Sequence, residues 1–200
     1  MIIYLHGFGS TGSSPKVDAL RKRFGTDNVI APDLPMDPEM VSKLVDNLVK
    51  LFLKFRKESE KLIFVGTSLG AFYANYFGHL YDCPIVVVNP SGKPSETLQS
   101  KLGVNYNYLT GEEFIVSVAH LEKLNVMRQY IQESYSPSLI NLFVAKDDEV
   151  ISYETMLENF PHVKVTMMED GGHRFTKHWD KVVDRIESLL ETDKVKYAVD

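Results

Sequence analysis

Short apolar runs alternate with longer segments of helical periodicity along the whole chain. This alternation is typical of a parallel sheet with helices on both faces. The apolar runs consist largely of consecutive Val, Ile, Leu and Phe residues, which favours strands that are covered on both sides. The pattern predicts six strands, over residues 2–5, 29–31, 62–65, 85–88, 139–145 and 163–168.

Apolar residues three and four positions apart predict helices between these strands. The first helix begins at Pro15 with Ser14 as its cap, because proline is tolerated at the first helical position and serine is a favoured N-cap. A second helix follows Asp37 and Pro38 by the same logic. A third covers about residues 68–78, and a last helix carries an apolar stripe made of Trp179, Val182, Val183, Ile186 and Leu190.

The segment 91–137, between the fourth and fifth predicted strands, breaks this regular alternation. It is rich in Gly, Asn, Tyr and Ser, and one helix is predicted in it, from about residue 112 to 124. Long excursions in compact domains are usually functional, so we expect a lid over a site rather than an irregular loop. The chain is therefore predicted to be one α/β domain, residues 1–200, with 91–137 as a lid-like insertion.

Composition and charge narrow the class of partner. The chain has 200 residues, of which 44% are hydrophobic and 24% charged, so one core can form without disulfide or metal staples. Its formal net charge of −5 and the lack of a basic run disfavour a nucleic-acid partner. Cys83 is the single cysteine, and no Cys or His spacing predicts a metal site. Because the pattern contains neither a signal peptide nor a membrane span, a cytoplasmic location is expected.

Residues 62–71 carry the first candidate for chemistry. A buried strand is followed by Gly66-Thr67-Ser68-Leu69-Gly70 and then by a helical pattern. The Gly-x-Ser-x-Gly spacing alone is a weak signal, but the order strand, turn and helix is what a nucleophile elbow requires. The turn forces the serine into a strained backbone conformation, and the glycines leave room for neighbouring elements. Ser68 is therefore the predicted nucleophile; the alternative is a serine that only caps the helix.

A serine nucleophile needs a base, and the base needs an orienting acid. The fifth strand is followed by Asp147 and Asp148, and the sixth by a glycine turn that ends in His173. Ligands of open α/β folds bind at the carboxyl edge of the sheet, where these turns should meet. The chain order Ser68, Asp148, His173 is that of an α/β-hydrolase triad. Asp147 is the rival for the acid, and the register after the strand favours Asp148.

The tetrahedral intermediate of acyl transfer needs N–H donors aimed at its oxyanion. Leu69, the residue after the nucleophile, supplies one backbone N–H, and the loop after the first strand should supply the second, for which Phe8 is the candidate. His6 is expected to brace this loop rather than to catalyse. Ordinary structural hydrogen bonds are expected of the histidines that lie outside a glycine turn, namely His79, His162 and His178.

The same loop also matches a dinucleotide-binding pattern. Gly7, Gly9 and Gly12 give the spacing Gly-x-Gly-x-x-Gly after a strand, and Asp33 follows about 20 residues later. In a Rossmann fold the third glycine lies inside the helix, whereas Pro15 places the helix start beyond Gly12. A dinucleotide-binding Rossmann enzyme is therefore the less favoured alternative.

Further short segments are distinctive, at 3–8, 66–70, 88–90, 107–113, 148–150 with Tyr153, and 171–175. Together they resemble the small bacterial YqiA/YcfP-like esterases of the α/β-hydrolase superfamily, over nearly the full chain. The elbow is shared across the superfamily, while the Asn-Tyr-x-Thr-Gly-Glu segment that starts at Asn107 is much narrower. The resemblance implies an α/β-hydrolase fold with a minimal six-stranded sheet. It also implies a serine carboxylesterase for short acyl esters, with thioesters as an open alternative, and Ser68, Asp148 and His173 as its triad.

The expected function is thus two-step acyl transfer at Ser68, with a small acyl ester as the partner and no cofactor or metal. A non-catalytic α/β-hydrolase-like binding protein is the competing class, because a fold alone does not fix a function. The pattern predicts neither the natural substrate nor the oligomeric state. Candidates for the acyl pocket, which are equally consistent with a small satellite core, are Tyr106, Tyr108, Phe114 and His120 of the insertion.

Overall fold

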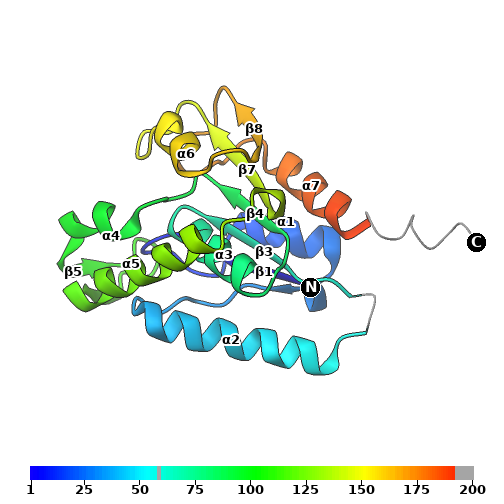
Figure 1. Cartoon of the computed structure of the whole chain (residues 1–200), viewed down its shortest axis with the longest axis horizontal. Coiled ribbons are helices and arrows are strands. Elements are labelled where there is room, and N and C mark those ends of the chain that lie inside the picture. Colours follow the sequence, from blue (N-terminus) through cyan, green and yellow to red (C-terminus); the bar gives the residue numbers. More distant parts are fainter. Residues whose placement is uncertain (58–59, 192–200) are drawn as a thin grey trace, which may run out of the picture.

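The computed structural model describes residues 1–57 and 60–191, which form a six-stranded sheet with helices on both faces (Figure 1). The strands are β1 (Ile2–Leu5), β2 (Val29–Ile30), β3 (Ile63–Thr67), β4 (Ile85–Val88), β7 (Ile140–Ala145) and β8 (Lys164–Met168). Their order is β2-β1-β3-β4-β7-β8, and every neighbouring pair is parallel. The predicted parallel sheet is confirmed; residues 58–59 and 192–200 of the expected domain lie outside the described residues.

The strand register aligns the carboxyl ends of the strands. Leu5 of β1 lies opposite Gly66 of β3, and Ala145 of β7 lies opposite Met168 of β8. Because all strands are parallel, these ends face the same edge of the sheet. The loops after β1, β3, β4, β7 and β8 therefore meet at that edge, and they include every loop in which candidate chemistry was predicted.

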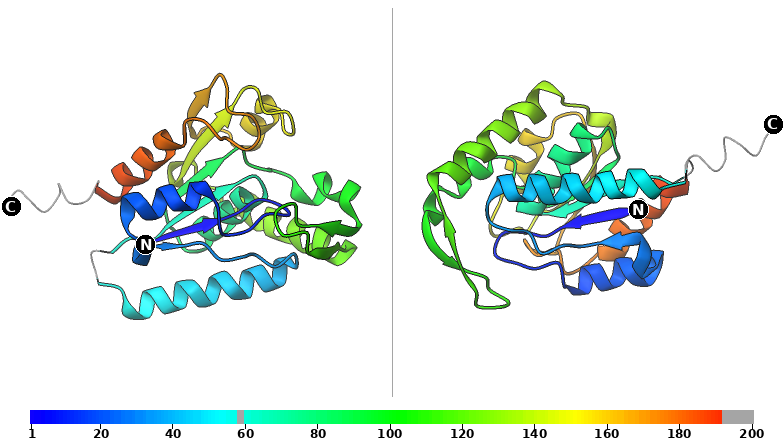
Figure 2. Two further views of the ribbon diagram at one scale, coloured as in Figure 1. Left: turned by 180° about the vertical axis from the view of Figure 1, so that it is seen from behind. Right: turned by 90° about the horizontal axis from the view of Figure 1, so that it is seen from below.

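Side chains alternate between the two faces of the sheet, and each face has its own helices. Ile3 and Leu5 belong to the core that includes α2 (Pro38–Phe55), α3 (Leu69–Leu80), α5 (Val118–Glu133) and α6 (Tyr153–Asn159). Ile2 and Tyr4 belong to the core that includes α1 (Pro15–Phe24) and α7 (Trp179–Glu191). In the right-hand view of Figure 2, α2 and α5 lie on one side of β1 and α1 lies on the other. Burial of apolar side chains in both layers drives this arrangement.

The predicted starts of the first two helices are confirmed by their caps. The Ser14 hydroxyl accepts a hydrogen bond from the Val17 N–H, and the Asp37 carboxylate accepts one from the Glu39 N–H. Each cap precedes a proline in the first turn. The pattern does not predict α6, whose 7 residues are too few to show a clear period.

The segment between β4 and β7 differs from the expectation. After a short helix, α4 (Pro94–Thr97), it forms an antiparallel hairpin of β5 (Gly103–Tyr106) and β6 (Glu113–Val116). The helix predicted over about 112–124 is therefore wrong at its start, because α5 begins only at Val118, after the Ser117 cap, and continues to Glu133. In β6 the more buried Phe114 and Val116 alternate with exposed neighbours, which is the period of a strand.

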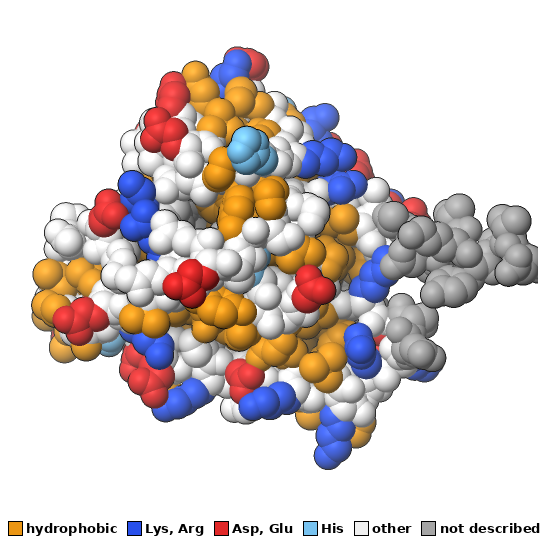
Figure 3. Space-filling model, in the orientation of Figure 1, with side chains coloured by type: hydrophobic (Ala, Val, Ile, Leu, Met, Phe, Trp, Pro, Cys, Tyr) orange, Lys and Arg blue, Asp and Glu red, His pale blue; other side chains and the backbone are white. Residues whose placement is uncertain are grey.

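Figure 3 shows how charged side chains are distributed over one face of the described chain. Lys and Arg side chains are spread over several elements there, and no continuous basic stripe crosses this face. Within residues 1–57 and 60–191, no helix is both long and apolar enough to cross a membrane.

Candidate active site

Ser68 lies at a tight turn between β3 and α3, in a backbone conformation that L residues seldom adopt. Its φ is 53° and its ψ is −121°. The glycines on either side are required by space: a Cβ on Gly66 would lie 2.2 Å from the Gly70 carbonyl oxygen, and one on Gly70 would lie 2.0 Å from the Leu5 carbonyl oxygen. Strained conformations of this kind cluster at functional sites, where surrounding structure enforces them. The geometry is that of a nucleophile elbow.

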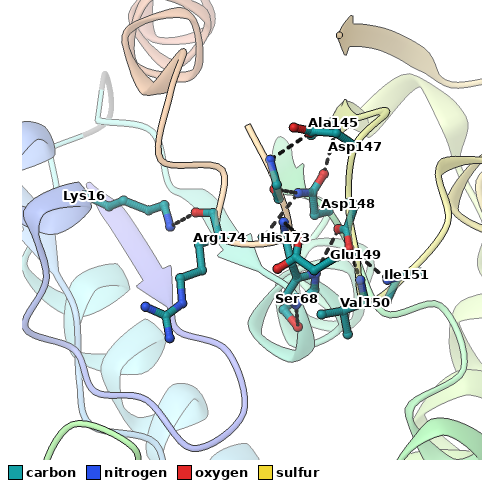
Figure 4. Close-up of polar contacts among 12 residues, drawn as sticks. Lys16, Ser68, Ala145, Asp147, Asp148, Glu149, Val150, Ile151, His173 and Arg174 are labelled. Carbon is teal, nitrogen blue, oxygen red and sulfur yellow. Dashed lines mark hydrogen bonds and ion pairs between the residues drawn. The ribbon is translucent and has the colours of Figure 1, made fainter. Parts of the chain in front are cut away.

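The structure brings Ser68, His173 and Asp148 together at the carboxyl edge of the sheet (Figure 4). His173 Nε2 lies 3.0 Å from Ser68 Oγ, and His173 Nδ1 lies 2.8 Å from Asp148 Oδ2. A carboxylate can only accept, so Nδ1 carries the hydrogen and Nε2 is free to accept the Ser68 hydroxyl proton. The Asp148 side chain is fully buried, and its other oxygen accepts hydrogen bonds from the N–H groups of Val150 and Ile151.

The two neighbours of Asp148 bind the backbone of the histidine loop instead of its ring. Asp147, the rival for the acid, accepts hydrogen bonds from the N–H groups of Gly171 and Gly172, at 3.2 and 2.8 Å. Glu149 accepts one from the His173 N–H at 2.9 Å, and this hydrogen bond lowers the pKa of the Glu149 carboxyl below its ordinary value. Figure 4 shows all three acidic residues beside His173. Of these three carboxylates, that of Asp148 is the one that accepts a hydrogen bond from the imidazole, so Asp148 is placed to orient the base.

Asn89, directly after β4, connects the end of β7 with the histidine loop. It is not among the site residues predicted from the sequence. It is fully buried, with a φ of 43°. Its side-chain oxygen accepts a hydrogen bond from the Ala145 N–H at 2.9 Å, while its side-chain nitrogen donates to the carbonyl oxygens of Gly172 and His173, at 2.9 and 3.2 Å. The signal that could have singled it out is an amide residue at the end of an otherwise apolar strand.

A third support for the histidine loop comes from α1. Lys16 Nζ donates a hydrogen bond to the Arg174 carbonyl oxygen at 2.5 Å (Figure 4). Burial, followed by the charge of Arg174, lowers the pKa of the Lys16 ammonium to about 8. The Arg174 guanidinium in turn lies over the Tyr108 ring of the hairpin, 5.1 Å from its centroid. The loop that carries the base is thus held from the sheet, from α1 and from the insertion.

The loop after β1 lies against the nucleophile, as its proposed oxyanion role requires. A Cβ on Gly7 would be 3.3 Å from Ser68 Cβ and 3.8 Å from Ser68 Oγ. His6 braces this loop: its Nδ1 lies 2.8 Å from the Gly7 carbonyl oxygen, and its Nε2 accepts a hydrogen bond from the Leu34 N–H at 2.8 Å. Since Nε2 accepts, Nδ1 donates, and the ring is neutral. Burial lowers the pKa of His6, which favours this form.

A cavity of about 330 Å³ lies beside the elbow, between the loop after β1 and the hairpin. Both predicted oxyanion residues, Phe8 and Leu69, are in its wall. The hairpin reaches the loop directly, because the Asn107 side chain donates to the Ser10 carbonyl oxygen at 2.9 Å. The other lining residues are His6, Gly7, Gly9, Asp33, Leu34, Pro35, Met36, Tyr73, Glu112, Glu113 and Phe114.

Of the four insertion residues considered for the acyl pocket, Phe114 lines this cavity and packs edge-to-face on Phe8, with ring centroids 5.3 Å apart. Tyr106 is exposed, and its hydroxyl donates to Glu113. Tyr108 lies under Arg174, and His120 completes the capping box of α5 through the Ser117 N–H. Of the four candidates, Phe114 is thus the one in the cavity wall, while the other three have different contacts.

The glycine pattern that resembles a dinucleotide site has a structural explanation. A Cβ on Gly12 would lie 2.1 Å from the Ala31 carbonyl oxygen, and the Gly12 N–H donates to Asp33 Oδ1 at 2.7 Å. Helix α1 begins at Pro15, so Gly12 lies outside it. Gly12 and Asp33 thus bind each other and hold the two loops together. The third glycine and the acidic residue, which supported the dinucleotide alternative, therefore both have a structural role.

The remaining histidines have other surroundings than the imidazole that bonds to Ser68. His79 is held between the Asn75 carbonyl oxygen and the Ser136 N–H, and His178 contacts Asp170. His162 has a φ of 63°, a turn conformation. Among the described residues, no group of three or more His, Cys, Asp and Glu side chains is arranged to hold a metal ion.

Comparison with known sequences identifies one family. The model of the Uncharacterised protein family UPF0227 matches residues 1–191. Relatives include UPF0227 protein ECA1814 of Pectobacterium atrosepticum, 30% identical over 114 residues, and UPF0227 protein YcfP of Salmonella paratyphi B, 30% identical over 112 residues. These alignments cover 54% and 51% of this chain but only 61% and 57% of the two relatives. The resemblance to YcfP-like proteins inferred from the motifs is confirmed.

Solved structures with a similar fold include Est1E from Butyrivibrio proteoclasticus, with a TM-score of 0.71 and 12% identity over 97% of this chain and 88% of that one. Another is MGS-MChE2, an alpha/beta hydrolase enzyme from a sediment metagenome, with a TM-score of 0.61 and 18% identity over 98% of this chain and 90% of that one. At these identities the likeness shows the fold, and the predicted α/β-hydrolase fold is confirmed.

Proposed function

Because the chain belongs to the UPF0227 family and has the α/β-hydrolase fold, we propose that it is a serine esterase that hydrolyses small acyl esters. The observation that carries the proposal is the hydrogen-bonded series Ser68, His173 and Asp148, with separations of 3.0 and 2.8 Å. A strained serine in reach of an imidazole, itself oriented by a buried carboxylate, is the arrangement that activates a weak hydroxyl nucleophile. A similar solved structure, the Esterase domain from a Rhodothermus marinus protein, agrees with this proposal, with a TM-score of 0.65 and 14% identity over 97% of this chain and 86% of that one.

In the first half-reaction, Ser68 Oγ attacks the carbonyl carbon of the ester while His173 Nε2 takes the hydroxyl proton. The carbonyl oxygen becomes an oxyanion, which accepts hydrogen bonds from the backbone N–H groups of Phe8 and Leu69. Asp148 keeps the hydrogen on Nδ1 and stabilises the imidazolium. Collapse of the tetrahedral intermediate breaks the ester bond, and His173 returns the proton to the departing alcohol, which leaves the acyl group on Ser68.

In the second half-reaction, water attacks the acyl carbonyl carbon and gives its proton to His173 Nε2. A second tetrahedral intermediate forms, with its oxyanion held by the same two N–H groups. Its collapse breaks the bond to Ser68 Oγ, which regains the proton from His173, and the carboxylic acid is released. Every step uses groups of this chain and water.

Hydrolysis of p-nitrophenyl esters tests the proposal, with Ser68→Ala as the inactive variant. Ser100→Ala is the matched control, because Ser100 is an exposed serine outside the site. Turnover of short-chain esters by the wild type and by Ser100→Ala, with a loss of more than about 10³-fold in Ser68→Ala, agrees with the proposal. A wild-type protein that folds but hydrolyses none of the esters favours the non-catalytic binding protein instead.

A further inference from the structure

Two cationic side chains, Lys16 and Arg174, lie together beside the histidine loop. Lys16 Nζ donates a hydrogen bond to the Arg174 carbonyl oxygen, and the Arg174 guanidinium lies over the Tyr108 ring, 5.1 Å from its centroid. In Figure 4 both side chains lie on one side of His173, and Asp148 lies on the other. We call Lys16 and Arg174 the cation pair. The proposed base thus lies between this pair and the proposed acid.

Arg174 connects the two loops that flank Ser68. Tyr108, on which its guanidinium is stacked, donates its backbone N–H to the Gly9 carbonyl oxygen at 3.0 Å. A Cβ on Gly9 would lie 3.6 Å from the Tyr108 ring, and a Cβ on Gly7, in the same loop, would lie 3.8 Å from Ser68 Oγ. The stacked Arg174 and Tyr108 therefore extend from the loop of the base to the loop that lies against the nucleophile.

Neither member of the cation pair has a carboxylate within ion-pair distance among the described residues. The acidic side chains around the histidine loop have other donors. Asp147 and Glu149 accept hydrogen bonds from backbone N–H groups of residues 171–173. Asp170 pairs with Lys177. The counter-ion of the cation pair is therefore not supplied by this part of the chain.

The surroundings of the cation pair leave its charge uncompensated. Burial lowers the pKa of the Lys16 ammonium, and the charge of Arg174 lowers it further, to about 8. The Trp179 ring, 5.5 Å from Lys16 Nζ, adds the weak attraction of a cation–π contact. Beyond the bond to the Arg174 carbonyl oxygen, the N–H donors of the two side chains have no hydrogen-bond partner among the described residues. A bound oxyanion would pair with these donors and relieve the repulsion between the two cations.

The proposed mechanism places the alcohol part of the ester next to His173. The imidazole returns its proton to the departing alcohol, so the alcohol oxygen lies beside Nε2. Arg174 follows His173 directly in the chain, and its side chain lies over the hairpin at Tyr108. The cation pair is thus placed beside the alcohol part of a bound ester.

Resting on the esterase function proposed above, we propose that the alcohol part of the substrate carries a carboxylate or phosphate group, which binds to Lys16 and Arg174. The planar guanidinium matches the geometry of both groups, and the ammonium adds a second positive charge. Lys16 and Arg174 are thus specificity-determining residues, and esters of uncharged alcohols are the poorer substrates.

Matched acetate esters of substituted phenols test this proposal. The m- and p-acetoxybenzoates are compared with their methyl esters, and p-acetoxyphenyl phosphate with its dimethyl ester, so that each pair differs in charge. Each kcat/KM for acetate release is divided by the ester's rate of reaction with imidazole, an uncharged nucleophile, to remove intrinsic reactivity. In the wild type, at least one anionic ester should exceed its neutral partner by about fivefold or more. This ratio should decline between about 0.05 M and about 0.5 M NaCl, because salt screens the charges.

Substitution of the cation pair separates binding of the anion from catalysis, because the ratio compares two esters on the same variant. The ratio should fall to near one in Arg174→Met, fall in part in Lys16→Met, and be retained in part in Arg174→Lys. Lys177→Met is the matched control: it removes a cation of the same loop that is already paired with Asp170, and it should keep the wild-type ratio. The p-nitrophenyl esters of glutarate and pentanoate test a charge on the acyl part, and there the anionic ester should gain no preference.

The proposal is overturned by a ratio near one in a wild type that hydrolyses the neutral esters, or by a ratio that survives in Arg174→Met. It is also overturned by an equal loss in Lys177→Met, or by a preference for the glutarate ester that depends on Arg174. A preference for the carboxylates alone, or for the phosphate alone, supports it and identifies the group that binds. A wild type that hydrolyses none of the esters overturns the esterase function as well.

Discussion

The side-chain amide of Asn89 donates a hydrogen bond to the carbonyl oxygen of His173 over 3.2 Å, from a position with no exposed surface. The same side chain accepts a hydrogen bond from the N–H of Ala145, the last residue of β7. One buried residue therefore connects the loop of the proposed base with the strand that precedes the proposed acid. The hydrogen bonds of the Asn89 side chain go to Ala145, Gly172 and His173, and Asn89 does not line the cavity, so we assign it the role of a positioning residue.

Asn89→Ala should lower kcat by about 10- to 100-fold while KM stays within about twofold, because the base is displaced but the cavity is unchanged. The free energy of unfolding should also fall, by about 1–3 kcal/mol, since buried partners lose their hydrogen bonds. Asn141→Ala is the control: Asn141 is a buried asparagine of β7 whose partners are Ile85 and Arg185, away from the site. Steady-state kinetics at matched folded fraction would contradict the role if both variants lost the same activity.

The two adjacent aspartates should differ sharply in their effect on activity. Asp148→Asn removes the carboxylate that fixes the hydrogen on His173 Nδ1, so kcat should fall by about 10³- to 10⁴-fold. Asp147→Asn keeps the hydrogen-bonding shape and changes only contacts to Gly171 and Gly172, so we expect a loss below about tenfold. Comparable losses in the two variants, measured as kcat at saturating ester, would show that the acid was assigned wrongly.

His6 should make the fold less stable in mild acid. Burial lowers its pKa in the folded chain below the ordinary value of 6.5, so below that pH the unfolded chain binds the proton more readily. The free energy of unfolding from this group is thus retained at higher pH and declines as the pH falls through about 6.5. Denaturant unfolding at several pH values should show a smaller decline in His6→Phe, which is also less stable at neutral pH. An unchanged decline would mean that other groups cause it.

Several features of this chain can be predicted from its sequence because the residues that cause them are neighbours in the chain. The elbow follows from a strand, a serine and two glycines that are contiguous in sequence, and the helix starts follow from Ser14 and Asp37 next to prolines. The choice of Asp148 over Asp147 came from the register after a strand, and the structure places Asp148 against the imidazole. These inferences needed no knowledge of distant contacts.

Features that depend on contacts between residues far apart in the chain cannot be predicted in the same way. The side chain of Asn89 bonds to residues 56 to 84 positions away, and an amide at the end of an apolar strand does not predict which residues these are. The pattern predicts a helix from about residue 112, whereas the structure has the strand β6 from Glu113. The four residues of this strand are too few to establish a period of two, and α5 follows after one residue.

Reaction with a fluorophosphonate tests the activated serine most directly, since only a hydroxyl deprotonated by a neighbouring base attacks it readily. The adduct is located by mass spectrometry of peptides from the wild type, Ser68→Ala and His173→Ala. We expect one adduct, on Ser68, which is absent from Ser68→Ala and forms far more slowly in folded His173→Ala. A folded wild-type protein that forms no adduct on Ser68, or forms it equally fast without His173, would show that His173 does not activate Ser68.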